Sequence, residues 1–394
     1  MRAGATWSAG ERAPWEPAPY PYDRLRDLHA LASRHPGGAV DLSIGTPCDP
    51  PPDVAVAALG RSVTLRGYPP SAGTDGFRDA ARAWMERRFS VEVPRAALGA
   101  CVGTKELVTG LPSMLRLRAP DRDTVFYPEV SYPSYAMGAE LAGCRAYPVP
   151  VDGDGHLDLA TIDAADRARG LVLWANSPSN PTGKLDDLGA AARWGRENGV
   201  LVASDECYVE LTWHGRGRSI LEHGRSGVVA VHSLSKRSNF AGARAGFYAG
   251  DDAVVGFLVD VRRHAGLMVP GPIQDAAQAA LGDDGHVDEQ RQRYRQRLER
   301  FAGVLASTGS AVRLPGGTFY LWAPTPERFA DDWAFARWLA ENGGVVVSPG
   351  DLYGKAGAGH VRVALVQPLD RLALVAERLG APWEVAKTGT SGVA

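Results

Sequence analysis

The stretch VHSLSKRSNFAGARAGFYAG, residues 231–250, carries a cluster of polar side chains between two apolar runs. Ser233, Ser235 and Lys236 follow the first run at once, and Arg244 stands just before the second. Short β-rich apolar runs of this kind are typical of buried strands. Hydroxyl groups and an arginine fork bind phosphate, and a lysine amine reacts with aldehydes, so a phosphorylated aldehyde would engage all four side chains. Each signal is weak alone, because a lysine after a strand is more often a solvated surface residue.

Similar apolar runs alternate with helical patterns along the chain. The candidate strands are TVFYP from residue 124, CRAYPVP from 144, GLVLWAN from 170, GVLVASD from 199, VVAVHS from 228 and AGFYAG from 245. Before them, Thr74 stands where a helix N-cap would, and Phe77, Ala81 and Trp84 recur at helical spacing on a face that we expect to be buried. Strands that alternate with helices predict βαβ units and an α/β fold with a mostly parallel sheet.

The pattern changes towards the C-terminus. Residues 287–301, VDEQRQRYRQRLERF, predict a long charged helix with Tyr294, Leu298 and Phe301 as its apolar seam. Its arginines could suggest a nucleic-acid face, but the interleaved acids favour a solvated helix between domains. The stretches VRLPGGTFYLWAP, GGVVVSPGDLYG and GHVRVALV then predict the strands of a smaller α/β domain.

Length and charge limit the class of protein. The chain has 394 residues, more than one typical core, so we expect two domains or a large domain with a satellite. Its formal net charge of -2 gives no global attraction to nucleic acid or to an anionic membrane. Its four cysteines form no CxxC pair, which argues against a zinc site or a disulfide framework. We therefore expect no metal site. The chain has neither the apolar core of a signal peptide nor a run of about 18 apolar residues, so we expect a cytoplasmic protein.

Ligands of open α/β sheets bind beyond the carboxyl ends of the strands, so the residues at those points are site candidates. Asp205 and Tyr208 follow one candidate strand, and Asn176 and Asn180 follow another. Ordinary alternatives stay open at this point. Asp205 could cap the next helix, and Asn180 could form an Asx turn before Pro181.

A further loop predicts an anion site. In CVGTKELVTG, Gly103 and Thr104 stand at the start of a predicted helix, where free backbone N–H groups and the helix dipole attract an anion. A phosphate could be held there by Thr104 with its neighbouring amides, by Ser233 and Ser235, and by the guanidinium of Arg244.

The motifs NPTG, SDECY and SLSKRSNFAGARAGF arrive together, in this order and with familiar spacing. With them the chain resembles the fold-type-I enzymes of the aspartate aminotransferase superfamily, class I and II, which use pyridoxal 5'-phosphate. The stretches VDLSIGTPCDP and GYPPSAGT are most similar to the sequences of N-succinyldiaminopimelate aminotransferases of actinobacterial type. The resemblance implies a large cofactor-binding domain at 45–285 with a mostly parallel, seven-stranded type of sheet. It also implies a small α/β domain at 286–394 and an N-terminal arm at 1–44 that belongs in part to the small domain.

The resemblance implies a role for each residue around the cofactor. Lys236 would form a Schiff base with the cofactor aldehyde and move the proton between the substrate carbon and the cofactor carbon. Asp205 would pair with the pyridine nitrogen and keep it protonated. Tyr208 and Asn180 would hydrogen-bond the phenolic oxygen, and Tyr132 in SYPSY would stack on the ring. The further cofactor-binding residues would be Gly103, Thr104, Lys105, Ser233, Ser235 and Arg244.

The resemblance also implies substrate contacts and a dimer. Arg362 in HVRVALV would grip the α-carboxylate of the substrate with two parallel charge-assisted bonds, and Asn180 would join it. Gly45 would let its backbone approach the same carboxylate, because it has no side chain. Tyr68 would reach the cofactor phosphate of the neighbouring subunit, which implies a symmetric homodimer with shared sites. The alternatives are an arginine–carboxylate pair within a strand and a core or turn tyrosine.

Three positions depart from the family's pattern. Ala243 stands where an aromatic residue is usual, and Gly316 and Gly317 stand where at least one bulkier residue is expected. Such changes would enlarge or reshape a pocket if they lie in it.

Three functions compete at this point. The first is a transaminase that moves an amino group between glutamate and a keto acid, with an N-succinyldiaminopimelate-type substrate as a candidate. The second is an enzyme of β- or γ-elimination, replacement or ring closure on an activated amino acid such as S-adenosylmethionine. The third, an effector domain of a transcriptional regulator, would need an attached DNA-binding domain, and the N-terminal arm is too short and too Pro-rich for one.

Overall fold

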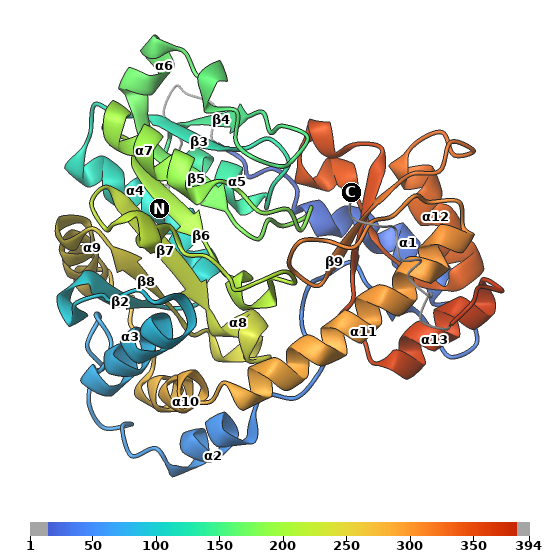
Figure 1. Ribbon diagram of the computed structural model, residues 1–394, viewed down its shortest axis with the longest axis horizontal. Helices are drawn as coiled ribbons and strands as arrows, with labels where there is room; N and C mark the ends of the chain where they lie inside the picture. The colour runs from blue at the N-terminus through green and yellow to red at the C-terminus, as the bar shows by residue number, and fades with distance from the viewer. Residues whose placement is uncertain (1–14, 384–394) are drawn as a thin grey trace, which may run out of the picture.

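The computed structural model describes residues 15–383, and its largest sheet has seven strands (Figure 1). They lie in the order β2-β8-β7-β6-β5-β3-β4. Their bounds are β2 (Leu98–Cys101), β3 (Thr124–Pro128), β4 (Arg145–Val149), β5 (Gly170–Asn176), β6 (Leu201–Asp205), β7 (Val228–Ser233) and β8 (Gly246–Gly250). The neighbours from β7 to β4 are parallel, whereas β8 is antiparallel to β7 and to β2. The α/β fold with a mostly parallel sheet is therefore confirmed.

The apolar runs predict every strand of this sheet except β2. Its sequence LGAC is short and has no β-branched or aromatic residue, so it gives no strand signal. In the register of β2 with β8, Gly99 faces Tyr248, and a Cβ at residue 99 would lie 2.4 Å from the Tyr248 ring. Glycine makes room there for a buried ring that lies far away in the sequence.

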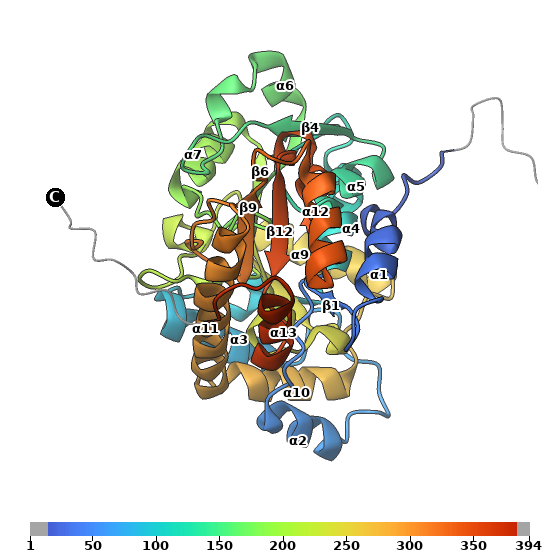
Figure 2. The ribbon, with the colours of Figure 1, turned by 90° about the vertical axis from the view of Figure 1, so that its right-hand side faces the viewer.

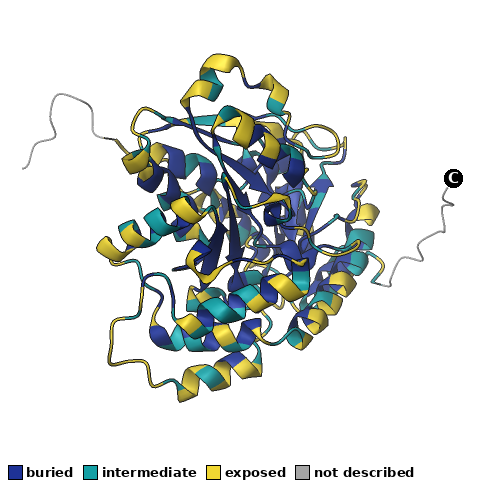
Figure 3. Ribbon diagram, turned by 60° about the vertical axis from the view of Figure 1, so that its left-hand side comes forward, coloured by how far each residue is buried: buried dark blue, intermediate teal, exposed yellow. Residues whose placement is uncertain are grey.

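Helices cover both faces of this sheet, and Figure 3 shows the buried strands between helices whose outer faces are exposed. The helices are α2 (Asp53–Arg61), α3 (Asp75–Phe89), α4 (Thr104–Arg118), α5 (Ser134–Leu141), α6 (Ala164–Arg169), α7 (Leu188–Asn198), α8 (Leu234–Arg237), α9 (Asp252–His264) and α10 (Gly271–Leu281). Side chains alternate along β5. Val172 and Trp174 pack with α4, α5 and α9, whereas Leu173 and Ala175 pack with α3, α7 and α10. As predicted, Thr74 caps α3, because its Oγ1 accepts the N–H of Phe77 at 3.3 Å.

A second core surrounds a smaller sheet in the order β11-β12-β9, with a separate parallel pair of β1 and β10. The elements are α1 (Arg26–Ala32), β1 (Val40–Asp41), α11 (Gly285–Ser307), β9 (Tyr320–Pro324), α12 (Asp332–Gly343), β10 (Val345–Val346), β11 (Ser348–Pro349), β12 (His360–Ala364) and α13 (Leu369–Arg378). The N-terminal α1 lies beside α12 (Figure 2). These two cores support the division of the chain at residues 44 and 285, which we keep as a proposal.

The long helix α11 runs along the boundary between the two parts of the molecule (Figure 1). Tyr294, Leu298 and Phe301 are buried on it, as the apolar seam predicts. Arg297 is buried beside this seam, and its two Nη atoms donate to the carboxylate of Asp49 at 2.7 Å. Within residues 15–383, no helix is long and apolar enough to span a membrane.

Candidate active site

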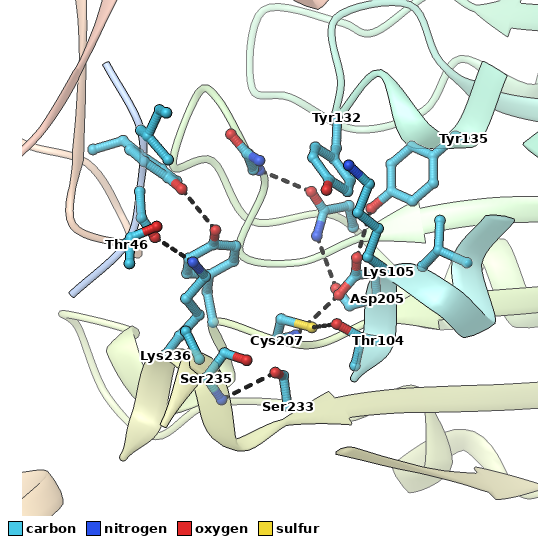
Figure 4. Close-up of a pocket in the computed structure, with 18 of the residues that line it drawn as sticks. Thr46, Thr104, Lys105, Tyr132, Tyr135, Asp205, Cys207, Ser233, Ser235 and Lys236 are labelled. Carbon is cyan, nitrogen blue, oxygen red and sulfur yellow. Dashed lines mark hydrogen bonds between the residues drawn. The ribbon is translucent and has the colours of Figure 1, made fainter. Parts of the chain in front are cut away.

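A cavity of about 1080 Å³, counted with its open mouth, lies at the carboxyl ends of β5, β6 and β7 (Figure 4). Residues of the N-terminal segment and of the smaller sheet close it from the other side. This is the place where open α/β sheets bind their ligands. The predicted residues that line it are Gly45, Thr104, Lys105, Tyr132, Asn180, Asp205, Tyr208, Ser233, Ser235, Lys236, Arg244 and Arg362. Of the predicted site, only Gly103 and Tyr68 are not among the lining residues.

Lys236 enters the cavity from the short helix α8, opposite Tyr132 and Lys105 (Figure 4). The helix begins directly after β7, where the hydroxyl of Ser233 accepts the N–H of Ser235 at 3.1 Å. The amine of Lys236 donates to the backbone oxygen of Gly45 and pairs with no carboxylate among the described residues. Burial lowers the pKa of Lys236 to about 8. A substantial fraction of this amine is therefore neutral, and hence nucleophilic, near neutral pH.

Asp205 ends β6 and is held by several donors. Tyr135 Oη donates to Oδ2 at 2.9 Å, and the N–H of Cys207 donates to Oδ1 at 3.1 Å. The carboxamide of Asn176 donates to the backbone oxygen of Asp205 at 2.8 Å. Burial raises the pKa of this carboxyl group. The alternative of a helix cap does not hold, because the short 3₁₀ helix that follows has Tyr208 at its N-cap.

The start of α4 forms an anion cradle with Arg244. Gly103 precedes the helix with a φ of +70°, and no side chain caps the helix there. A Cβ at residue 103 would lie 2.2 Å from Nη2 of Arg244, so only glycine lets this guanidinium approach. Arg244 donates to the backbone oxygen of Ala241 at 3.0 Å and has no acidic partner among the described residues. The free N–H groups and this cation, with the hydroxyls of Ser233 and Ser235 on the same cavity, suit a phosphate.

Arg362 on β12 is a buried cation without a carboxylate partner among the described residues. Its side chain is 1% exposed, and Nη1 donates to Oδ1 of Asn180 at 2.8 Å while Nη2 donates to the backbone oxygen of Ser43. The guanidinium carbon lies over two rings, 4.2 Å from the centroid of Tyr320 and 4.7 Å from that of Tyr353. The alternative of an arginine–carboxylate pair within a strand is therefore wrong. The Asx-type contact belongs to Asn176, whose Oδ1 accepts the N–H of Asn180 at 2.8 Å.

Gly45 and Tyr208 meet the same residue, Tyr320. A Cβ at residue 45 would lie 2.0 Å from the Tyr320 hydroxyl, which is a reason for glycine that the sequence did not reveal. The hydroxyls of Tyr208 and Tyr320 lie 2.7 Å apart. Close approach of a substrate to Gly45 stays a prediction.

Two predicted tyrosines differ in their settings. Tyr132 is half-buried at the cavity wall, edge-on to Tyr135 at 6.0 Å between ring centroids. Tyr68 is 98% exposed, so the alternative of a core tyrosine is wrong, whereas that of a turn tyrosine stays open. Its predicted contact with a neighbouring subunit stays a prediction, as does the stacking of Tyr132.

Several residues that line the cavity were not predicted from the sequence. They are Tyr20, Tyr22, Ile44, Thr46, Val108, Tyr135, Cys207, Ala241 and Tyr320. Tyr135 stands three residues after Tyr132 in SYPSY, and that spacing at the start of a helix could have placed both on one side. Tyr320 gave no signal, because its strand lies far along the chain and only the tertiary fold brings it to Tyr208.

The three residues that depart from the family's pattern are not among the described residues that line the cavity. Ala243 packs against the core of the large sheet. A Cβ on Gly317 would lie 2.4 Å from the ring of Pro178, so this glycine serves the packing of two loops. A Cβ on Gly316 would lie 3.4 Å from the backbone oxygen of Gly183, an ordinary contact distance, so packing does not require glycine there. None of them reshapes the cavity directly.

An open α/β sheet with a nucleophilic lysine, a buried carboxylate and an anion cradle at its strand ends defines an enzyme that handles an anionic ligand. Residues 38–379 match the family model of aminotransferase class I and II, and the chain belongs to this family. It is 43% identical to a probable aminotransferase of Mycobacterium tuberculosis over 91% of this chain and 84% of that protein.

Two further relatives extend the comparison. The chain is 41% identical to the 4-dedimethylamino-4-oxo-anhydrotetracycline transaminase OxyQ of Streptomyces rimosus, over 91% of this chain and 98% of that protein. The structure of a probable N-succinyldiaminopimelate aminotransferase from Thermus thermophilus matches with a TM-score of 0.82 and 32% identity, over 91% and 99% of the two chains. The protein is thus an aminotransferase. The relatives support neither elimination or replacement nor a regulator's effector domain as the alternative.

Proposed function

We propose that this aminotransferase uses pyridoxal 5'-phosphate to move an amino group between glutamate and a keto acid. The observation that carries the proposal is the placement of Lys236, Asp205 and Arg362 on one cavity, each buried or half-buried and none paired with an opposite charge among the described residues. An amino acid substrate and a phosphorylated pyridine cofactor together would supply the missing partners.

The cavity residues fit this cofactor. The cradle at Gly103, which the Arg244 guanidinium approaches because residue 103 has no Cβ, suits the phosphate. The N–H groups of Thr104 and Lys105 and the hydroxyls of Ser233 and Ser235 would complete it. The remaining residues in contact with the cofactor would be Tyr132 at the ring face, Asn180 and Tyr208 at the phenolic oxygen, Asp205 at the ring nitrogen and Lys236 at the aldehyde.

The chemistry that the bound cofactor supplies is withdrawal of electrons from the α carbon of the substrate. With the cofactor bound, Lys236 would accept and return a proton at the α carbon of the substrate, because its lowered pKa lets the amine do both near neutral pH. Asp205 would face the ring nitrogen, where its negative charge would favour the protonated form. Tyr135 and Cys207 keep that carboxylate oriented with the bonds described above.

Arg362 would bind the α-carboxylate of the substrate. Asn180 holds one edge of its guanidinium, and the rings of Tyr320 and Tyr353 fix its plane. Carboxylate binding would replace a costly unpaired charge with a charge-assisted pair.

The far end of the substrate would meet the mouth of the cavity. Lys105 is exposed there, has no acidic partner among the described residues, and holds its amine 5.0 Å from the ring centroid of Tyr20. This cation supports a substrate with a second acidic group, such as glutamate or an N-succinyldiaminopimelate-type compound, the substrate in the name of the Thermus relative.

A second candidate is a flat ring ketone, the kind of substrate named for OxyQ. Tyr20 and Tyr22 line the cavity, and aromatic faces suit such a ring. The two candidate substrates differ in their need for Lys105. An acidic substrate would pair with the charge of Lys105, whereas a neutral ring would not.

The first experiment is a visible absorption spectrum of the purified protein during a titration with L-glutamate. A cofactor band that gives way to the pyridoxamine form supports the proposal. A band that glutamate leaves unchanged contradicts glutamate as donor, and the absence of any band after incubation with pyridoxal 5'-phosphate contradicts the cofactor. Keto-acid and ring-ketone acceptors are then compared in the wild type and in Lys105→Met, which should lose activity only with acidic acceptors.

We also propose a homodimer in which Tyr68 reaches the partner's site. The segment that carries it is unusually apolar for an exposed surface: Val63 is 87%, Leu65 80% and Tyr68 98% exposed. Mixing Tyr68→Ala with Lys236→Ala, each inactive alone, should restore activity, because hybrid dimers contain one intact site. A monomer in analytical ultracentrifugation, or no restoration, would contradict this arrangement. A cytoplasmic location stays a prediction.

A further inference from the structure

Tyr320 connects the two halves of the cavity. Its hydroxyl lies 2.7 Å from that of Tyr208, its ring lies 4.2 Å from the guanidinium carbon of Arg362, and a Cβ at Gly45 would strike its hydroxyl. It is 2% exposed, so water does not compete for these contacts. No other described tyrosine touches both Tyr208 and Arg362 in this way.

We infer that Tyr320 is a positioning residue of the proposed reaction, with its hydroxyl acting on Tyr208 and its ring acting on Arg362. The inference rests on the proposed function, because Tyr208 and Arg362 are the proposed contacts of the cofactor and of the substrate. It assigns separate tasks to two parts of one side chain.

The hydroxyl task follows from proton counting. Each tyrosine has one O–H donor. If Tyr208 donates its proton to a ligand oxygen in the cavity, the bond between the two hydroxyls must be donated by Tyr320. A hydroxyl that accepts a bond is a stronger donor in turn. Tyr320 therefore directs the proton of Tyr208 into the cavity and strengthens its bond to the ligand.

The ring task follows from the placement of Arg362. The guanidinium keeps its Nε without a hydrogen-bond partner, so its orientation depends on Asn180, the backbone of Ser43 and the two neighbouring rings. A cation over a desolvated aromatic face is stabilised by the electrostatic field of the ring. Tyr320 thus holds the plane of the guanidinium before a carboxylate arrives.

Tyr353 offers a matched control. It is also 2% exposed, and its ring contacts the same guanidinium, at 4.7 Å. Its hydroxyl, however, lies 3.3 Å from that of Tyr22 and makes no bond with Tyr208. The pair Tyr320→Phe and Tyr353→Phe therefore removes one hydroxyl or the other beside Arg362 and keeps both rings.

The test is a pH titration of the visible cofactor band in the wild type and in these two variants, together with KM for the amino donor. Tyr320→Phe should raise the pH midpoint of the band by about 0.4–1 unit, the size of one lost hydrogen bond, because a weaker Tyr208 donor leaves the phenolic oxygen more basic. KM should change less than about twofold, since the ring remains. Tyr353→Phe should leave the midpoint unchanged.

A third variant tests the ring. Tyr320→Leu should add a rise in KM of about fivefold or more to the shift of the midpoint, the effect of a lost desolvated cation–ring contact. If the midpoint of Tyr320→Phe equals that of the wild type, or if Tyr353→Phe shifts it equally, the inference is overturned while the proposed function stands. If the wild type shows no cofactor band at all, the proposed function and the inference fall together.

Discussion

Buried charges in this protein follow two patterns, one in the cores and one at the cavity. In the cores, buried guanidinium groups meet carboxylates: Arg262 donates to Glu106 at 2.7 and 2.8 Å, and Arg297 donates to Asp49 at 2.7 Å. At the cavity, Arg362, Lys236 and Asp205 have only neutral hydrogen-bond partners among the described residues.

The difference separates charges that serve the fold from charges that serve a ligand. An unpaired buried charge costs folding free energy, because its lost hydration is not replaced. A protein that keeps three such charges on one cavity leaves their partners to be supplied by the bound molecules. Each of the following substitutions tests this difference between paired and unpaired charges.

The largest effect is expected for Lys236→Ala. Turnover should fall by at least about 10²–10⁴-fold, since the proton carrier is gone. The variant should fold normally, because the lysine pairs with no charge that it would leave behind. Steady-state turnover with the natural donor measures the effect, and Lys355→Ala, which removes an exposed lysine outside the cavity lining, is the control. Persistent turnover would remove Lys236 from its assigned role.

The two classes of arginine should respond in opposite ways to loss of charge. Arg362→Leu should raise KM for carboxylate substrates. The loss of binding free energy should be about 2–5 kcal/mol, the effect of losing a buried charge-assisted pair. Arg297→Leu should instead lower the free energy of unfolding by about 3 kcal/mol, because it strands the carboxylate of Asp49. KM and urea unfolding, measured on both variants, give the comparison. Equal effects of the two on KM would show that Arg362 is not a ligand-directed cation.

Asp205→Asn should separate catalysis from stability. The rate should fall by about 10²–10³-fold, the usual effect of removing one fixed electrostatic group. The cofactor-free variant should nevertheless be more stable than the wild type at pH 7, because burial raises the pKa of Asp205 and makes its charged form costly. That gain should disappear as the pH falls below about 4, where the carboxyl group is protonated in both the folded and the unfolded chain. Thermal unfolding at the two pH values checks the sign.

The sequence predicts more of the residues that line this site than of the residues that hold them in place. Ser233, Lys236 and Asp205 are predictable, because they follow strands whose apolar runs are strong and because parallel strands bring their carboxyl ends together. The contacts that hold these residues in place join segments that lie far apart in the sequence. Tyr320 meets Tyr208 across 112 positions, and Arg362 meets the backbone of Ser43 across 319. No local periodicity encodes such a meeting, so it emerges only from the packing of the two cores.

Glycines illustrate the same limit. A glycine before a helix predicts an anion site at Gly103, but two reasons for glycine appear only in the structure: a φ of +70° and the close guanidinium of Arg244, far away in the sequence. Gly45 is predictable as a point of close approach, yet the atom that excludes a Cβ there is the Tyr320 hydroxyl. The pattern therefore indicates where space is needed, and only the structure identifies what fills it.

The smallest effect concerns the pH at which Lys236 becomes reactive. An acidic partner would hold the amine in its charged form, whereas burial, with the nearby charges of Arg362 and Arg244, lowers its pKa from 10.5 to about 8. At pH 7 about one amine in ten is then neutral, against about one in three thousand for an ordinary lysine. Covalent incorporation of pyridoxal 5'-phosphate into the cofactor-free protein, followed by its visible absorbance, should accelerate about tenfold per pH unit and level off near pH 8. A rate that still rises at pH 10 would mean that Lys236 is as basic as a solvated lysine, and the contrast between its unpaired charge and the paired charges of the cores would fail at this residue.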